Sequence, residues 1–123
     1  MNDFIEICSC SPDELKELLV IRRGLKKLYK SGQKDLCLQD KSLVMLFEKP
    51  SLRTRMSFEV AMNDLGGNGI YVKPTDIGGL IGEREPIKDM ARVYDRYVDG
   101  IMARTFSHET LRELAQYADA PVI

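Results

Sequence analysis

The sequence has no long apolar run and no excess of basic residues. No apolar stretch approaches the roughly 20 residues that a helix needs to cross a bilayer, and the acidic start Met1-Asn2-Asp3 lacks the basic flank of a signal peptide. Lysine and arginine number 18 against 19 acidic residues, so the formal net charge is −1. We therefore expect no membrane or nucleic-acid partner, because both attract basic surfaces, and we expect a cytoplasmic protein.

Cysteine and histidine are also scarce. Cys8, Cys10 and Cys37 are odd in number and contain no Cys-x-x-Cys pair, and His108 is the only histidine. We therefore expect reduced thiols, no metal site and no cofactor. His108 invites a general-base role, but it falls in the first turn of a predicted surface helix and we assign it none.

Helix and strand patterns alternate along the chain, which at 123 residues has single-domain length. Short apolar runs predict strands, and apolar residues at three- and four-residue spacing predict helices. The expected strands are 42–47, 68–72 and 99–104, and the expected helices are 11–31, 51–65, 86–97 and 107–118. This order predicts an α/β fold, a doubly wound parallel sheet with helices on both faces, in a single domain.

The first predicted helix has clear end signals. Ser11-Pro12-Asp13-Glu14 is a capping box, with Pro12 at the first helical position. Lysines cluster at residues 26–30, where positive charge complements the helix dipole, and we prefer that interpretation to an anion patch.

The stretch 47–59 joins a buried strand to a helix through a polar turn. Pro50 disfavours a helical conformation at Lys49, so the helix begins after it. Ser51 to Thr54 then lie at the helix start, where backbone N–H groups lack partners and the dipole favours negative charge. The hydroxyls of Ser51 and Thr54 and the guanidinium of Arg53 add donors suited to a phosphate. The alternative is that Ser51 only caps the helix and the arginines are solvated.

A second charged position follows another predicted strand. Arg104 ends the run Ile101-Met102-Ala103, and ligands of such sheets bind beyond the carboxyl ends of the strands. The alternative for Arg104 is a simple ion pair with Asp99. Between these positions, residues 74–85 form a glycine-rich loop, which at this length tends to be functional.

Two segments resemble a known family. Phe-Glu-Lys-Pro-Ser-Leu-Arg-Thr-Arg-Met-Ser-Phe-Glu (47–59) resembles the carbamoyl-phosphate signature of the aspartate/ornithine carbamoyltransferase family, usually Ser-Thr-Arg-Thr-Arg, and Ile-Met-Ala-Arg-Thr-Phe-Ser-His (101–108) resembles its ornithine-type members. The resemblance implies transfer of a carbamoyl group from carbamoyl phosphate to an amine, commonly ornithine, which gives citrulline and phosphate in arginine metabolism. It implies that Arg104 is catalytic and that carbamoyl phosphate contacts Ser51, Leu52, Arg53, Thr54, Arg55 and Arg104.

The resemblance also concerns domains and assembly. It implies that residues 1–123 are the carbamoyl-phosphate-binding domain, that the second, amine-binding domain is absent, and that these residues alone are inactive. Family members form homotrimers, in which the loop reaches a neighbouring active site. The loop residues Ile77, Leu80 and Ile81 offer apolar contacts for this, unless they fold back onto their own subunit.

Three departures and several alternatives accompany the resemblance. Leu52 replaces the usual threonine, Leu80 falls near a glutamine of the family loop, and Arg84 falls near a basic residue of some members. The His-Pro-x-Gln segment and second domain are missing. The alternatives are aspartate or acylated ornithine as acceptor, the latter suggested by Ser51-Leu52-Arg53, and a non-catalytic phosphate-binding or assembly module.

Overall fold

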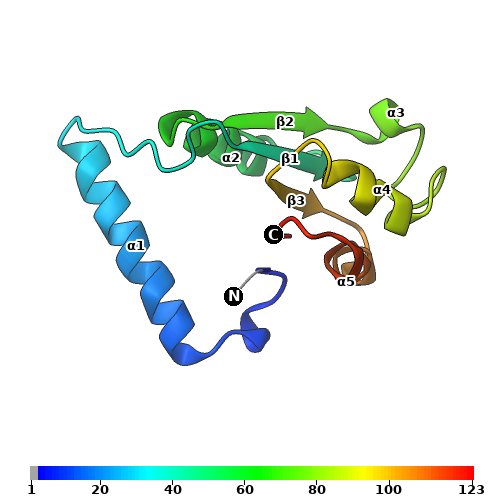
Figure 1. The fold of residues 1–123 in the computed structure, drawn as a ribbon, viewed down its shortest axis with the longest axis horizontal. Coiled ribbons are helices and arrows are strands. Elements are labelled where there is room, and N and C mark those ends of the chain that lie inside the picture. Colours follow the sequence, from blue (N-terminus) through cyan, green and yellow to red (C-terminus); the bar gives the residue numbers. More distant parts are fainter. Residues whose placement is uncertain (1–2) are drawn as a thin grey trace.

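A central strand organises a parallel sheet (Figure 1). In the computed structural model, which describes residues 3–123, β1 (Ser42–Phe47) lies between β2 (Asn68–Val72) and β3 (Gly100–Arg104), and both neighbours run parallel to it. Residues 43–47 are all buried, which explains why β1 is an unbroken apolar run. The three predicted strands are confirmed, except that Asp99 precedes β3.

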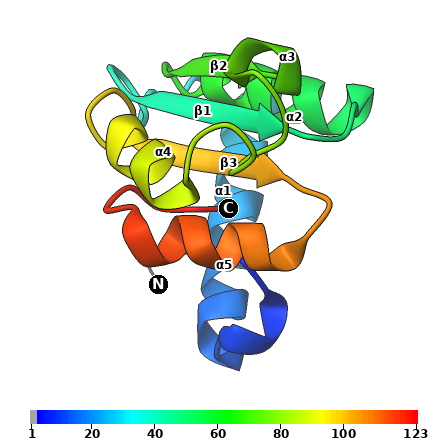
Figure 2. The ribbon, with the colours of Figure 1, turned by 90° about the vertical axis from the view of Figure 1, so that its right-hand side faces the viewer.

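Helices cover both faces of the sheet, as the sequence predicts. Successive residues of a strand point to opposite faces, so Met45 packs with Met62 of α2 (Leu52–Asp64) on one face. On the other face Val44 and Leu46 pack against residues of α4 (Ile87–Tyr94) and α5 (His108–Tyr117). Figure 2 shows α4 and α5 side by side. The doubly wound α/β arrangement is therefore confirmed.

The last residues pair beside β3. Ile101 donates its N–H to the carbonyl of Pro121 at 2.8 Å, and Ile123 donates to the carbonyl of Ile101 at 2.9 Å. Val122 forms a parallel bridge with Ile101 and is fully buried. Its N–H donates to the carboxylate of Asp3 at 2.8 Å, so the first described residues lie against the end of the chain.

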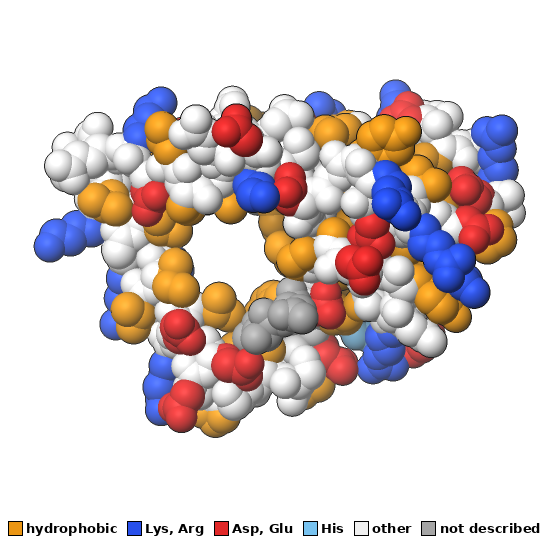
Figure 3. All heavy atoms as spheres, in the orientation of Figure 1, with side chains coloured by type: hydrophobic (Ala, Val, Ile, Leu, Met, Phe, Trp, Pro, Cys, Tyr) orange, Lys and Arg blue, Asp and Glu red, His pale blue; other side chains and the backbone are white. Residues whose placement is uncertain are grey.

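Helix α1 (Pro12–Lys30) stands apart from the sheet. Its predicted capping box is confirmed, because Ser11 and Glu14 hydrogen-bond reciprocally. No residue of α1 is buried, and Leu19, Val20 and Ile21 are each at least half exposed. Figures 1 and 3 show the opening between this helix and the rest of the molecule. None of the described helices is long and apolar enough to span a membrane.

The helical boundaries differ from the predictions between residues 74 and 97. A short helix α3 (Pro74–Ile77) occupies the start of the predicted loop. A second short element, the 3-10 turn η1 (Ile7–Ser9), lies near the amino end of the chain. Helix α4 ends at Tyr94, not Tyr97. Asp95 is its C-cap, and the Asp95 carboxylate accepts the N–H groups of Asp119 and Ala120. Tyr97 is 77% exposed, so its predicted place on a buried face is wrong.

The close packing around Gly67, just after α2, generates a prediction about stability. A Cβ on Gly67 would lie 2.5 Å from Met62 Cε and 3.0 Å from the carbonyl oxygen of Leu38, whereas a Cβ on Gly24 in α1 meets nothing within 4 Å. We expect Gly67→Ala to lower the free energy of unfolding by about 1–3 kcal/mol, as overpacking does. Gly24→Ala is the control and should cause no loss, because alanine favours helix.

Urea unfolding followed by circular dichroism measures both variants. An unchanged midpoint for Gly67→Ala would mean that the chain relaxes around this contact and that the close approach at the end of α2 is not a constraint.

Candidate carbamoyl-phosphate site

The carboxyl ends of β1 and β3 lie at the same edge of the sheet. Phe47 is in register with Arg104, and Glu48 donates its N–H to the carbonyl of Arg104 at 3.0 Å. The chain leaves β1 toward α2 on one face and leaves β3 toward α5 on the other. This divergence is the topological switch point at which doubly wound sheets bind ligands, and it brings residues 51–54 and Arg104 to one edge.

The 51–54 turn, residues Ser51 to Thr54, begins α2 with an open end. Ser51 is the N-cap by position, yet its side chain makes no capping bond; its hydroxyl donates to Thr54 Oγ1 at 2.9 Å. Within the described chain, the N–H groups of Leu52, Arg53 and Thr54 have no acceptor. The alternative that Ser51 serves only as a side-chain cap is therefore wrong. Unpaired N–H groups and the positive end of the dipole remain available to an anion.

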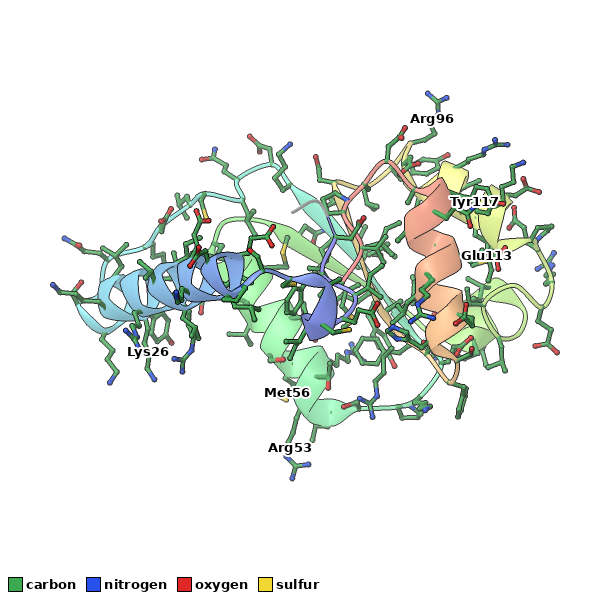
Figure 4. The ribbon with its side chains drawn as sticks, turned by 90° about the horizontal axis from the view of Figure 1, so that it is seen from below. Lys26, Arg53, Met56, Arg96, Glu113 and Tyr117 are labelled. Atoms are coloured by element: carbon green, nitrogen blue, oxygen red, sulfur yellow. The ribbon has the colours of Figure 1, made fainter. Side chains whose placement is uncertain are left out.

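The two arginines of α2 differ in their surroundings. Arg53 is exposed and projects from the start of the helix (Figure 4), with no partner among residues 3–123. Arg55 Nε lies 3.0 Å from Glu59 Oε1, and its guanidinium stacks 3.8 Å above the ring of Tyr71. Arg55 is thus held against β2, and it would have to leave these partners to bind an anion at the 51–54 turn.

Arg104 is exposed, and in the described part of the chain its side chain has no ion-pair partner. Asp99 instead accepts hydrogen bonds from Lys41 Nζ at 2.8 Å and from the N–H of Ser42 at 2.9 Å. The Lys41 hydrogen bond, followed by that of Ser42, lowers the pKa of the Asp99 carboxyl. This pair lies at the amino ends of β1 and β3, so the alternative of an Arg104–Asp99 pair is wrong.

The glycine-rich loop packs onto the core of its own subunit. Gly78 has a φ of 78°, in the left-handed region that glycine tolerates. Ile81 is buried in the core and Ile77 packs against that core, so two of the three apolar residues fold back onto their own subunit. Only Leu80, at 41% exposure, stays available for a partner.

Sequence reasoning missed one residue at this edge. Glu48 is 8% exposed, and its two carboxylate oxygens accept the N–H groups of Ile81 and Phe106. Beside it, Lys49 Nζ lies 4.6 Å from the centre of the Phe106 ring. The available signal was an acidic residue directly after a wholly buried strand.

His108 lies in a different cluster. Its Nε2 is 3.5 Å from Glu6 Oε2, and Arg112 lies 3.3 Å from the same oxygen. The Arg112 hydrogen bond lowers the pKa of the Glu6 carboxyl. The three cysteines form no disulfide, and among the described residues no group of three metal-binding side chains occurs.

Comparison with known proteins identifies the family of this chain. The profile of the family described as aspartate/ornithine carbamoyltransferase, carbamoyl-P binding domain, matches residues 2–123. An ornithine carbamoyltransferase of Halalkalibacterium halodurans is 48% identical over 99% of this chain and 38% of its own length. The chain thus spans about two fifths of the length of the curated relatives it matches.

Solved structures show the same likeness. The ornithine carbamoyltransferase of Pyrococcus furiosus superposes with a TM-score of 0.95 at 41% identity, covering 99% of this chain and 38% of that one. The catalytic subunit of M. jannaschii aspartate transcarbamoylase superposes with a TM-score of 0.87 at 31% identity, covering 100% of this chain and 40% of that one. The chain therefore belongs to the aspartate/ornithine carbamoyltransferase family and matches its carbamoyl-phosphate-binding domain.

Proposed function

We propose that the 51–54 turn and Arg104 bind carbamoyl phosphate for transfer of its carbamoyl group to ornithine. The observation that carries this proposal is the open start of α2, where the Ser51 hydroxyl turns to Thr54 and leaves three N–H groups unpaired. The names of the curated relatives, which at 44–48% identity are ornithine carbamoyltransferases, support ornithine as the acceptor.

The proposed reaction is a nucleophilic substitution at the carbonyl carbon of bound carbamoyl phosphate. The amine nitrogen attacks the carbonyl carbon of carbamoyl phosphate. The bond between this carbon and the oxygen that bridges to phosphorus breaks. Phosphate leaves with the bonding electron pair, the amine loses a proton to solvent or to the departing phosphate, and citrulline remains. Donors that hold the phosphate make it a better leaving group, and a cation at the carbonyl oxygen stabilises the charge that develops in the transition state.

The residues of this chain divide these tasks. The N–H groups of residues 52–54, the two hydroxyls and the Arg53 guanidinium hold the phosphate. Leu52 supplies only its N–H, because its side chain is apolar and 73% exposed. Arg104 contacts the carbonyl oxygen. Arg55 joins the phosphate only by leaving Glu59 and Tyr71.

The acceptor, the compartment and the assembly belong to the same proposal. The amine site lies in a second domain, so the present residues alone bind one substrate without completing the transfer. The likeness to an aspartate transcarbamoylase subunit keeps aspartate as the second candidate acceptor. We place the protein in the cytoplasm, in arginine metabolism, as a homotrimer.

The first prediction from this proposed function concerns Arg53. Arg53→Ala should weaken binding of both carbamoyl phosphate and inorganic phosphate by about 1.5–3 kcal/mol, the usual loss for a charge-assisted hydrogen bond. Leu52→Thr should change the affinity much less. Isothermal titration of the folded chain measures each affinity, with Arg23→Ala, an exposed arginine of α1, as the control.

Two results would contradict the proposal. Wild-type affinity in Arg53→Ala would remove this residue from the site. A folded wild-type chain that binds neither ligand would favour a non-catalytic assembly module.

The second prediction distinguishes the role of Arg104 from that of the 51–54 turn. Arg104→Ala should weaken binding of carbamoyl phosphate more than binding of inorganic phosphate, because only the former has a carbonyl oxygen. When the domain is joined to an amine-binding domain, the same change should lower kcat more than it raises KM, since the contact strengthens in the transition state. A rise in KM at unchanged kcat would leave Arg104 as a binding residue only.

The third prediction concerns assembly. Leu80 on the loop, Val93 near the end of α4 and Tyr97 just beyond it have exposed side chains with large apolar surfaces. We expect them to support self-association. Light scattering over a concentration series should show a species of three times the 14.0 kDa chain mass. Leu80→Glu should weaken it, whereas Leu19→Glu on α1 should not. A monomer at every concentration would mean that this domain does not assemble alone.

A further inference from the structure

Glu48 is the one charged residue that the described chain buries, at 8% exposure. A buried carboxylate is costly unless it is fully hydrogen-bonded, so its partners have to compensate for lost water. No lysine, arginine or histidine forms an ion pair with it within residues 3–123. Its partners are backbone N–H groups, which differ from a counterion in being fixed in position and direction.

Each oxygen of the carboxylate holds a different segment. Oε1 accepts the N–H of Ile81 at 3.0 Å, and Oε2 accepts the N–H of Phe106 at 2.7 Å. These partners are 33 and 58 residues away in sequence. Glu48 therefore bridges the glycine-rich loop and the segment that follows β3.

The bridge lies next to both halves of the candidate site. Glu48 is three residues before Ser51, and Phe106 is two residues after Arg104. The N–H of Glu48 also donates to the carbonyl of Arg104 at 3.0 Å, and the Lys49 ammonium lies over the Phe106 ring. Three contacts thus fix the Arg104 segment against Glu48 and Lys49, which lead into the 51–54 turn.

We propose that Glu48 is a positioning residue, which sets the distance of Arg104 and of the loop from the 51–54 turn. It touches no substrate; it acts through the two backbone segments that it holds. This inference rests on the proposed function of the site and adds a residue to it. Its chemical requirement is specific: two acceptors are needed, so a glutamine fits poorly, because its NH₂ group would face one of the two N–H donors.

The test uses Glu48→Gln in the full chain, with Glu113→Gln on the exposed side of α5 (Figure 4) as the matched control. Titration with carbamoyl phosphate and with inorganic phosphate should show a selective loss. We expect carbamoyl phosphate to bind about tenfold more weakly, because a displaced Arg104 loses its charge-assisted hydrogen bond to the carbonyl oxygen. Inorganic phosphate, held by the 51–54 turn, should bind nearly as in the wild type.

Hydrogen exchange provides a readout that needs no ligand. The amide of Ile81 or of Phe106 should exchange at least about tenfold faster in Glu48→Gln, because one of them loses its acceptor. The amide of Met45 in β1 should keep its protection. If Glu48→Gln does not fold, Glu48→Asp keeps the charge but is too short to reach both donors, and the same measurements apply.

The outcomes distinguish this inference from the function on which it rests. A wild-type chain that binds carbamoyl phosphate, with Glu48→Gln binding it equally well, overturns the positioning role alone. Equal loss of both ligands with faster exchange throughout the sheet also overturns it, because Glu48 would then serve stability only. A folded wild-type chain that binds neither ligand overturns the proposed function and this inference together.

Discussion

Burial of β1 on both faces is the constraint on which the other elements depend. A strand with no solvent-facing side needs an apolar layer above and below it and a paired neighbour on each edge. Parallel neighbours require crossovers, and right-handed crossovers place α2 on one face and α4 on the other. The same parallel direction then collects the ends of β1 and β3 at one edge. The packing that buries β1 therefore also places the ends of β1 and β3, which carry the candidate site, at one edge of the sheet.

Local signals in the sequence were sufficient for most of the fold. The apolar run at 42–47 and the capping box at Ser11 each depend on residues a few positions apart, and both are present as expected. The fate of the apolar loop residues was not accessible in this way. Ile81 is buried because the core between β1 and α4 has room for it, and that space exists only after distant segments have packed. Tyr97 is exposed and lies beyond the end of α4, close to Asp95, whose carboxylate is hydrogen-bonded to residues more than twenty positions later.

The candidate site shows the same division. The turn itself could be read from residues 47–54, since a strand, a proline and a helix start are neighbours in sequence. The sequence did not indicate which side chains of this turn and of the start of α2 are free of hydrogen-bond partners. The Ser51 hydroxyl faces Thr54 instead of a backbone N–H, and Arg55 is engaged by Tyr71 on the next strand. Glu48 gave no sign of its two backbone partners, because a carboxylate accepts from any donor that the tertiary structure brings within reach.

Helix α1 has a consequence for how this chain comes apart. None of its residues is fully buried and only a few, such as Leu25 and Leu28, are partly buried, so its own hydrogen bonds and its capping box supply most of what holds it. In proteins most of a helix's stability comes from tertiary packing of its apolar face, and α1 has little of it. Its unfolding free energy is therefore small and separate from that of the sheet. A protease added to the native chain will cut between residues 12 and 35 first, and will leave a shorter fragment in which the sheet and the edge that carries the site are intact.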